Sequence, residues 1–375
     1  MKYYLISGEA SGDLHGSNLM KALKTLDSEA EFRFWGGDLM KEVGGTCVKH
    51  YKELAFMGFV EVIMNLRTIL RNIEFAKKDI EEYKPDAVIL IDYPGFNLRV
   101  AKFIKQLGIK VYYYISPQIW AWKTGRVHQI KKVVDRMFVI LPFEKDFYRK
   151  YEMEVDFVGH PLLDALETRE FLSKDNFLQK YQLDNRPIIA LLPGSRNQEI
   201  KVKLPIMLSV MSDFSDYQFV IAGAPSQTID YYKRFMHQYS VKVINNDTYN
   251  LLNNSVAALV TSGTATLETA LLNIPEVVCY RGSRISYEIG KRLVKHISYI
   301  SLVNLIMDKE VVKELIQQEL THQNLRTELQ KILTEPYRSQ VVEDYRKLRE
   351  KLGGEGASMR TAKHIVDDLR AKDFR

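Results

Sequence analysis

Short apolar runs alternate with longer amphipathic stretches along most of this 375-residue chain. Apolar runs of this length are typical of strands buried on both faces, and the stretches between them have the length and periodicity of helices. The alternation predicts βαβ units and parallel sheets. The predicted strands are Tyr3–Ser7, Phe32–Trp35, Ala87–Asp92, Lys110–Ile115, Arg136–Leu141, Ile188–Pro193, Gln218–Ala222, Val241–Ile244, Ala257–Val260 and Glu276–Tyr280.

The strands fall into two sets, separated by a break between about Pro161 and Pro187 that contains a charged helical connector, Asp164 to Lys180. A chain of this length usually divides into two cores. We therefore expect an α/β protein with two Rossmann-like, doubly wound parallel-sheet domains facing across a cleft. Residues 1–165 form the first domain, 166–340 form the second, and the C-terminal helices at about 340–375 pack back on the first. Ligands in such sheets bind beyond the carboxyl ends of the strands, so the turns after strands should carry the chemistry.

The most informative of these turns is Ser262-Gly263-Thr264, which follows the strand Ala257–Val260 and opens a helix. Helix N-termini carry unpaired N–H groups and a partial positive charge, and a turn of small residues lets a diphosphate approach them. Glu268, one turn inside the helix, can accept hydrogen bonds from a ribose diol. The segment is typical of a nucleotide-diphosphate site, although an ordinary Ser/Thr-capped helix has the same pattern.

A second turn of this kind, Gly194-Ser195-Arg196, follows the first strand of the second set. Its backbone N–H groups and guanidinium group can bind a diphosphate, whereas the plainer interpretation is a βα turn with a surface arginine. Tyr280 and Arg281, at a later strand end, are candidates for contact with a base or a phosphate. Asn304 follows a strand-like segment, Tyr299–Val303, and is a candidate for the same ligand. For each of these residues alone, packing or surface exposure is an equally good interpretation.

Asp92 ends the apolar strand that begins at Ala87, and it should point into the cleft. A carboxylate at a strand end, near apolar walls, is suited to the role of general base. The alternative is a turn aspartate two residues before Pro94.

Three other segments are candidates for an acceptor site. The glycine-rich turn after the first strand contains Glu9 and Ser11, and it lacks the spacing of a dinucleotide or P-loop motif. Gln118, Trp120 and Trp122 precede a basic helix, a combination that suits a sugar or a lipid headgroup but also suits helix packing. The apolar stretch Leu54–Leu70, which contains Met57, Gly58 and Phe59, predicts either a core helix or an entrance for acyl chains at a membrane face.

Composition and charge narrow the class of protein. The chain is 46% hydrophobic and 27% charged, as in globular proteins, and no apolar run is long enough to span a membrane. The N-terminus turns polar too soon for a signal sequence, and Cys47 and Cys279 lack metal-ligand spacing, so we expect a cytoplasmic protein. Residues 99–150 hold 12 Lys/Arg against 3 Asp/Glu, a local balance of 12 − 3 = +9. This basic surface suits anionic lipid or a phosphorylated substrate, and no nucleic-acid motif accompanies it.

Taken together, the turns resemble those of the lipid-A-disaccharide synthase family of two-domain GT-B glycosyltransferases. The matching segments occur in family order along nearly the whole chain. They are Ser7-Gly8-Glu9-Ala10-Ser11-Gly12-Asp13, Met57-Gly58-Phe59-Val60-Glu61-Val62, Ser116-Pro117-Gln118-Ile119-Trp120-Ala121-Trp122, Leu141-Pro142-Phe143-Glu144, Gly159-His160, Leu192-Pro193-Gly194-Ser195-Arg196, Ser262-Gly263-Thr264 and Ser301-Leu302-Val303-Asn304.

The resemblance implies an inverting transferase that joins UDP-2,3-diacylglucosamine to 2,3-diacylglucosamine 1-phosphate. The products would be the β(1→6)-linked lipid A disaccharide 1-phosphate and UDP. Asp92 matches the family's catalytic aspartate in the motif D-x-P-D-F-N, and Gly95 stands where that motif has a second aspartate. Arg196 and the turn at Ser262 would hold the diphosphate, and Glu268 would hold the ribose.

The same resemblance implies a peripheral enzyme at the cytoplasmic face of the inner membrane, in contact with its lipid and compatible with a homodimer. No Asp-x-Asp pair occurs in the sequence, so we expect neither a metal ion nor another cofactor. Two alternatives remain. One is a UDP-sugar epimerase of the same fold that acts on soluble substrates, and the other is an inactive relative at the membrane surface.

Overall fold

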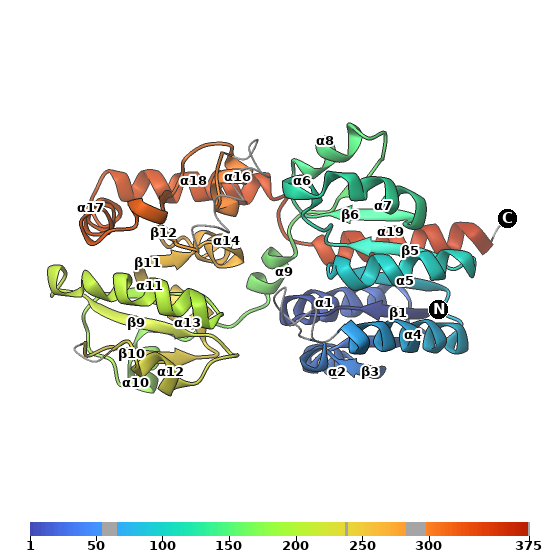
Figure 1. Ribbon diagram of the computed structural model, residues 1–375, viewed down its shortest axis with the longest axis horizontal. Helices are drawn as coiled ribbons and strands as arrows, with labels where there is room; N and C mark the ends of the chain where they lie inside the picture. The colour runs from blue at the N-terminus through green and yellow to red at the C-terminus, as the bar shows by residue number, and fades with distance from the viewer. Residues whose placement is uncertain (55–65, 237–238, 283–297, 374–375) are drawn as a thin grey trace. The chain divides into compact units, whose positions relative to one another are not determined.

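The computed structural model of the protein describes residues 1–54, 66–236, 239–282 and 298–373. The chain divides into two compact units. The first comprises Met1–Thr168 and Leu352–Arg375, and the second comprises Arg169–Lys351. Each unit contains one parallel β-sheet with helices on both faces (Figure 1). This confirms the predicted fold class of two doubly wound parallel-sheet domains.

The sheet of the first unit has seven strands in the order β3-β2-β1-β4-β5-β6-β7, and neighbouring strands pair in parallel. The change of direction in this order, between β1 and β4, is the point at which doubly wound sheets bind ligands. The strands are β1 (Lys2–Ile6), β2 (Glu31–Gly36), β3 (Thr46–His50), β4 (Ala87–Ile91), β5 (Lys110–Tyr114), β6 (Arg136–Val139) and β7 (Asp156–Phe157).

Alternate residues of these strands belong to two separate cores. Tyr4 and Leu90 pack with α4, α5 and α7 on one face, whereas Tyr3 and Ile89 pack with α1 and α19 on the other. A strand buried on both faces needs apolar residues throughout, which is why β4 is a continuous apolar run. The helices of the unit are α1 (Ala10–Leu26), α2 (Asp38–Val43), α4 (Leu66–Tyr83), α5 (Pro94–Gln106), α6 (Ile119–Trp122), α7 (Val127–Val133), α8 (Glu144–Arg149), α9 (Pro161–Glu167) and α19 (Ala357–Asp373).

The second unit repeats this plan with a six-stranded parallel sheet in the order β10-β9-β8-β11-β12-β13. Helices α11 and α17 cover one face, and α10 and α13 cover the other. The strands are β8 (Ile188–Leu192), β9 (Gln218–Gly223), β10 (Lys242–Asn245), β11 (Ser255–Thr261), β12 (Glu276–Tyr280) and β13 (Lys313–Ile316). The helices are α10 (Lys174–Tyr181), α11 (Asn197–Ser209), α12 (Ile229–Lys233), α13 (Thr248–Asn253), α14 (Thr264–Leu271), α16 (Leu302–Met307), α17 (His322–Ile332) and α18 (Tyr337–Lys351).

Every predicted strand is present, with ends within two residues of those expected. The strand-like interpretation of Tyr299–Val303 was wrong, because Ser301 caps the N-terminus of α16 with its side chain. The connector predicted over Asp164–Lys180 is two helices, α9 and α10, rather than one. Strands β3, β7 and β13 were not predicted. They lie at or next to the edges of the sheets, where strands are short or only partly buried and their apolar signal is weak.

The chain returns to the first unit at Leu352, later than the expected position near residue 340, because α18 packs on α14, α16 and α17 of the second unit. The return is fixed by Asp164. Its carboxylate accepts hydrogen bonds from the backbone N–H groups of Gly356, Ala357 and Ser358, at 2.6, 3.1 and 2.8 Å. These are N–H groups at the start of α19 that no helical carbonyl can satisfy. A residue on α9 therefore caps the last helix of the chain.

We predict that Asp164→Ala lowers the free energy of unfolding by about 1–3 kcal/mol, because it leaves helix N-terminal N–H groups without an acceptor. Chemical denaturation monitored by circular dichroism measures this change. Asp367→Ala, on the exposed side of α19, is the matched control and should stay within about 0.5 kcal/mol of the unmodified protein. Equal midpoints for the two variants would show that the cap does not hold α19.

Candidate active site

Asp92 follows the last residue of β4, at the carboxyl edge of the first sheet. Its backbone has φ +43°, and Tyr93 after it has φ +48°, so two consecutive residues other than glycine adopt the left-handed conformation. Each such residue costs roughly 1–3 kcal/mol unless the surroundings enforce it. Strain of this kind tends to be kept where a side chain must be presented in one direction. The turn therefore presents the Asp92 carboxylate at the end of the strand, as the sequence predicts.

Contacts from two elements, β5 and α5, hold this turn in place. The Asp92 N–H donates to the Tyr114 carbonyl oxygen at 3.1 Å. The Asp92 carbonyl oxygen accepts from the Tyr113 hydroxyl at 2.5 Å and from the Asn97 Nδ2 at 2.7 Å. Tyr113 and Asn97 are both fully buried. Strand β5 and helix α5 thus enforce the left-handed turn through buried hydrogen bonds.

The glycine-rich first turn packs directly on this strained turn. A Cβ atom on Gly8 would lie 2.5 Å from the Tyr93 Cγ, so only glycine fits against that ring. Glu9 precedes α1 and Ser11 lies in its first turn, and both are exposed. Asp13, by contrast, is buried and accepts from the N–H groups of Gly37, Leu39 and Met40, which is a structural role. Of the first turn, Glu9 and Ser11 remain as predicted acceptor residues.

The environment of Asp92 shifts its titration toward neutral pH. Burial, reinforced by the negative charge of Glu9, raises the pKa of Asp92 to about 6, and the backbone N–H of Tyr93 opposes the shift. A carboxylate with this pKa is largely ionised at pH 7 and is a stronger base than an ordinary aspartate. A carboxylate in this position and with this pKa is suited to the role of general base, which stays a prediction.

A second buried carboxyl group, Glu144, feels the negative charge of Asp92 and was not singled out from the sequence as a site residue. It accepts from the N–H groups of Leu141 and Ile140, at 2.9 and 3.2 Å. Burial raises the pKa of Glu144 to about 7, although these N–H groups and the Ser116 hydroxyl oppose the shift. A glutamate in a Leu-Pro-Phe-Glu turn looks like a simple helix start, so only the fold reveals its burial.

The two tryptophans before the basic helix differ in their environment: Trp120 is packed in the fold, and Trp122 is exposed. Trp120 is 8% exposed, and its ring meets Phe143 edge-on at 4.9 Å. Packing on Phe143 gives Trp120 a structural role, and its contact with the acceptor stays a prediction. Trp122 is 54% exposed, with the Lys123 ammonium group 4.1 Å above its ring. Gln118, directly before α6, is exposed as well and stays a predicted acceptor residue.

Two other predictions for the first unit have different outcomes. Met57, Gly58 and Phe59 lie outside the described residues. Gly95 is exposed, and a Cβ atom there would meet nothing within 4 Å. The position would accept the aspartate of the related motif without strain, so the glycine is not required by packing.

In the second unit, the strand register brings the two predicted diphosphate turns together. Leu192 of β8 pairs with Val260 of β11, so Gly194 and Ser262 each lie two residues beyond a paired position at the carboxyl edge of adjacent strands. Neighbouring strands are about 4.8 Å apart. The turns Gly194–Arg196 and Ser262–Thr264 therefore border one another, which the sequence did not establish.

The backbone of the first of these turns is already engaged. The Glu199 carboxylate accepts from the N–H groups of Ser195 and Arg196, at 3.2 and 3.3 Å. Gly194 has φ +107°, and a Cβ atom there would collide with Glu199. The side chain of Arg196 is 69% exposed and 4.0 Å from the Glu199 carboxylate. The N–H groups expected from the sequence to bind an anion are therefore occupied, and the guanidinium group of Arg196 is the exposed group of this turn that can bind one.

The second turn and its helix fit the prediction more closely. Gly263 has φ +150° and, like Thr264, is exposed at the N-terminus of α14, while the Ser262 hydroxyl donates to the Ile300 carbonyl oxygen at 3.0 Å. Glu268 lies further along α14 and accepts from the Tyr249 hydroxyl at 3.1 Å. Burial raises the pKa of Glu268.

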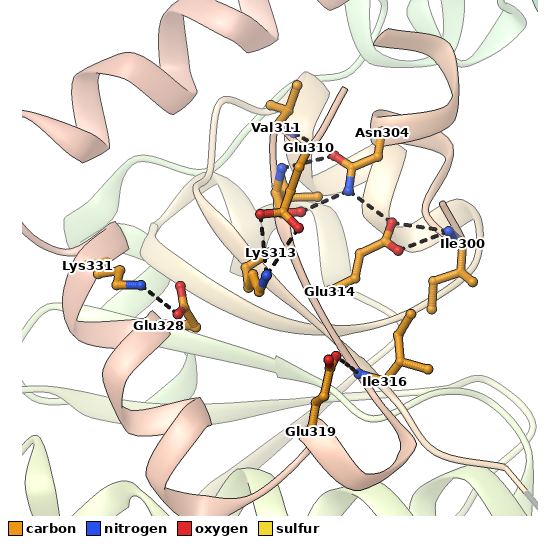
Figure 2. A network of polar contacts seen from close by, with 11 residues as sticks. Ile300, Asn304, Glu310, Val311, Lys313, Glu314, Ile316, Glu319, Glu328 and Lys331 are labelled. Carbon is orange, nitrogen blue, oxygen red and sulfur yellow. Dashed lines mark hydrogen bonds and ion pairs between the residues drawn. The ribbon is translucent and has the colours of Figure 1, made fainter. Parts of the chain in front are cut away.

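Two other predicted ligand contacts in this unit are used by the fold. Asn304 is fully buried. Its Nδ2 donates to the Val312 carbonyl oxygen and to Glu314, and its Oδ1 accepts from the N–H groups of Val311 and Val312 (Figure 2). All four hydrogen-bonding positions of its amide are satisfied, so the prediction that Asn304 binds the ligand is corrected to a structural role.

Arg281 has a similar outcome. Its guanidinium group donates to the carbonyl oxygens of Gln317 and Leu320, so it anchors the segment after β13. The prediction that it contacts a base or a phosphate is not supported. Tyr280 is half-buried at the end of β12 and remains a predicted contact.

Two surface cavities in the described part of the chain lie away from the predicted site residues. A cavity of ≈430 Å³ in the second unit is lined by Asn273, Glu335 and residues of α18, and includes none of the predicted site residues. No group of three or more His, Cys, Asp or Glu side chains among the described residues is placed to hold a metal ion. None of the described helices is both long and apolar enough to cross a membrane.

Solved structures share the fold at low sequence identity. The glycotransferase of kitacinnamycin has a TM-score of 0.66 and 14% identity, and the comparison covers 98% of this chain and 99% of that one. UDP-GlcNAc 2-epimerase from Neisseria meningitidis, bound to UDP-GlcNAc, has a TM-score of 0.63 and 15% identity, over 99% and 100% of the two chains. These neighbours establish the two-domain GT-B type of fold and do not separate transferase from epimerase.

Comparison of sequences separates the transferase from the epimerase interpretation. The family described as lipid-A-disaccharide synthetase matches residues 3–366. A lipid-A-disaccharide synthase from Syntrophus aciditrophicus is 41% identical over 378 residues, covering 98% of each chain. Another, from Coxiella burnetii, is 38% identical over 371 residues and covers 97% of each chain. The chain therefore belongs to the lipid-A-disaccharide synthetase family.

Proposed function

We propose that the protein is an inverting glycosyltransferase that joins UDP-2,3-diacylglucosamine to 2,3-diacylglucosamine 1-phosphate. The products are the β(1→6)-linked lipid A disaccharide 1-phosphate and UDP. Family membership over residues 3–366 supports the reaction and disfavours the epimerase alternative, which has only fold similarity at 15% identity behind it. The observation that carries the mechanism is the half-buried Asp92 carboxylate, presented by a strained turn at the carboxyl edge of the first sheet.

Asp92 is assigned as the general base. Its carboxylate removes the proton of the acceptor 6-hydroxyl as the oxygen attacks the anomeric carbon of the donor. The new C–O bond forms on the face opposite the diphosphate, the bond from the anomeric carbon to the diphosphate breaks, and UDP leaves with the electron pair. The pKa of about 6 keeps Asp92 ionised at neutral pH and lets it hold the transferred proton better than an ordinary aspartate.

The leaving diphosphate gains negative charge during this step, so the second unit must stabilise it. Arg196 supplies an exposed guanidinium group beside the N-terminus of α14, whose N–H groups and dipole favour an anion. Glu268 is assigned to the ribose of UDP. Because the Glu199 carboxylate holds the N–H groups of Ser195 and Arg196, the turn acts through the Arg196 side chain.

The lipid substrates imply a membrane surface. Leu70 and Phe75 on α4 and Trp122 on α6 are large apolar side chains with exposed fractions of 50%, 46% and 54%. With the basic residues between Arg99 and Lys150, they support peripheral attachment to anionic lipid, which we assign to the cytoplasmic face of the inner membrane. We propose that Glu9, Ser11 and Gln118 line the acceptor site. A homodimer is compatible with this assignment, and no metal ion or other cofactor enters the mechanism.

Asp92→Asn should lower the turnover number by on the order of a hundredfold or more, because the amide cannot accept the hydroxyl proton. Release of UDP in the presence of both lipid substrates measures this effect, and the affinity for UDP should change little. Asp146→Asn, at an exposed position on α8, is the matched control and should retain activity. Full turnover by the Asp92→Asn variant would remove Asp92 from the mechanism.

The pH dependence follows from the raised pKa of Asp92. Because the base must be ionised, kcat/KM should rise with pH and level off above an inflection near the pKa of about 6.

The contribution of Asp92 to the free energy of unfolding should fall as the pH rises. The folded-state pKa lies above the ordinary value of 3.8, so Asp92 favours folding below about pH 4, and this contribution is lost as the pH rises through about 6. Asp92→Asn should remove that loss. An activity profile without an inflection in this range would exclude Asp92 as the base.

Arg196→Ala should weaken UDP binding by about tenfold or more, the effect of losing one charge-assisted contact to phosphate. The affinity of Arg196→Lys for UDP should lie between those of the unmodified protein and the alanine variant, because lysine keeps the charge but loses the bidentate geometry of the guanidinium group. Isothermal titration calorimetry measures both, and since Arg196 is 69% exposed, melting temperatures should stay unchanged. Unaltered affinity in the alanine variant would place the diphosphate elsewhere.

A further inference from the structure

Lys203 is a buried cation that the proposed mechanism does not yet use. It lies on α11, seven residues after Arg196, and is only 2% exposed. In the described part of the chain its ammonium group has no hydrogen bond or ion pair, and its nitrogen lies 6.0 Å from the centre of the Tyr280 ring. Lysine is almost never buried to this extent without a partner, because removing its charge from water is costly.

The groups around Lys203 come from the first diphosphate turn and from β12, the strand beside the one that leads into the second turn. Glu199 and Arg196 at the start of α11, and Cys279 at the end of β12, are the charged or titratable groups that act on it, and burial lowers the pKa of Lys203. Cys279 pairs with Thr261, the residue directly before the Ser262 turn. The ammonium group is therefore close to Tyr280, at the carboxyl end of β12.

A second polar group at this edge also lacks a partner. Thr261 is 6% exposed, and its hydroxyl has no hydrogen-bond partner among the described residues. Side chains alternate along a strand, so Thr261 lies on the same face as Ala257 and Leu259, which pack against α11. A buried lysine whose ammonium group has no hydrogen bond or ion pair in the described part of the chain thus lies near a buried hydroxyl without a hydrogen-bond partner, and both are close to two turns suited to phosphate. Native proteins satisfy most such groups, so a ligand is the expected partner.

We propose that the Lys203 ammonium group binds the diphosphate of the sugar nucleotide from the α11 side of the sheet, with the Thr261 hydroxyl as an additional donor. Arg196 meets the same anion from the exposed side. The assignment rests on the proposed function. It adds a cation that is already desolvated before the ligand arrives, so its interaction with phosphate is stronger than that of an exposed lysine.

The test compares Lys203→Met with Lys203→Arg and with Lys201→Met, a matched control at an exposed position on the same helix. Titration calorimetry with UDP and with uridine separates contacts to the diphosphate from contacts to the nucleoside, and thermal unfolding is recorded without ligand. Lys203→Met should bind UDP about tenfold or more weakly, bind uridine as the unmodified protein does, and melt at an equal or higher temperature. Lys203→Arg should retain part of the affinity for UDP, and Lys201→Met all of it.

The outcomes distinguish this assignment from the proposed function. Unmodified protein that binds no UDP would overturn both. UDP affinity in Lys203→Met equal to that of the unmodified protein would overturn the role of Lys203 and leave the proposed function intact. An equal loss of affinity for UDP and uridine, together with a lower melting temperature, would show that Lys203 is a structural residue and would likewise overturn the assignment.

Discussion

The first unit depends on one strained connection, the turn in which Asp92 and Tyr93 both adopt the left-handed conformation. Neither residue is glycine, so the conformation persists only because its surroundings enforce it. Buried hydrogen bonds from Tyr113 and Asn97 hold the Asp92 carbonyl oxygen, and the Tyr93 ring packs against Gly8. The glycine-rich first turn, strand β5 and helix α5 can thus be understood as the support of a single carboxylate. Their fixed geometry holds Asp92 at the carboxyl edge of the sheet.

The two units carry opposite electrostatic character at their sheet edges. In the first unit, burial raises the pKa values of Asp92 and Glu144, the charge of Glu9 adds to the shift of Asp92, and that of Asp92 adds to the shift of Glu144. These shifts suit proton transfer at neutral pH. In the second unit, Arg196, Lys203 and the N-terminus of α14 favour an anion. A transferase that removes a proton from its acceptor and stabilises a diphosphate leaving group needs both environments. The fold provides them on separate sheets, and each sheet positions its groups through strand register.

The sequence predicts the sheets well because buried parallel strands have a strong local signal, as in the apolar run of β4. It also places Asp92 and the two turns that we propose for the diphosphate at the carboxyl ends of strands, since these residues follow strands directly. It does not predict the partners of a polar side chain. Glu199 takes the N–H groups of the Gly194 turn, Asn304 satisfies its amide within the fold, and Trp120 packs on Phe143. Each of these outcomes depends on contacts between segments whose distance in space the local pattern does not encode, and the same holds for the burial of Glu144 and Lys203.

The central claim is that the protein transfers a sugar from a UDP donor to a lipid acceptor by base catalysis. It is tested most directly by measuring UDP release from UDP-2,3-diacylglucosamine with and without 2,3-diacylglucosamine 1-phosphate, in the presence of EDTA. We predict release that requires the acceptor and is unaffected by the chelator. Turnover of UDP-N-acetylglucosamine without any lipid acceptor, or bound UDP-diacylglucosamine that releases no UDP when the acceptor is added, would contradict the account.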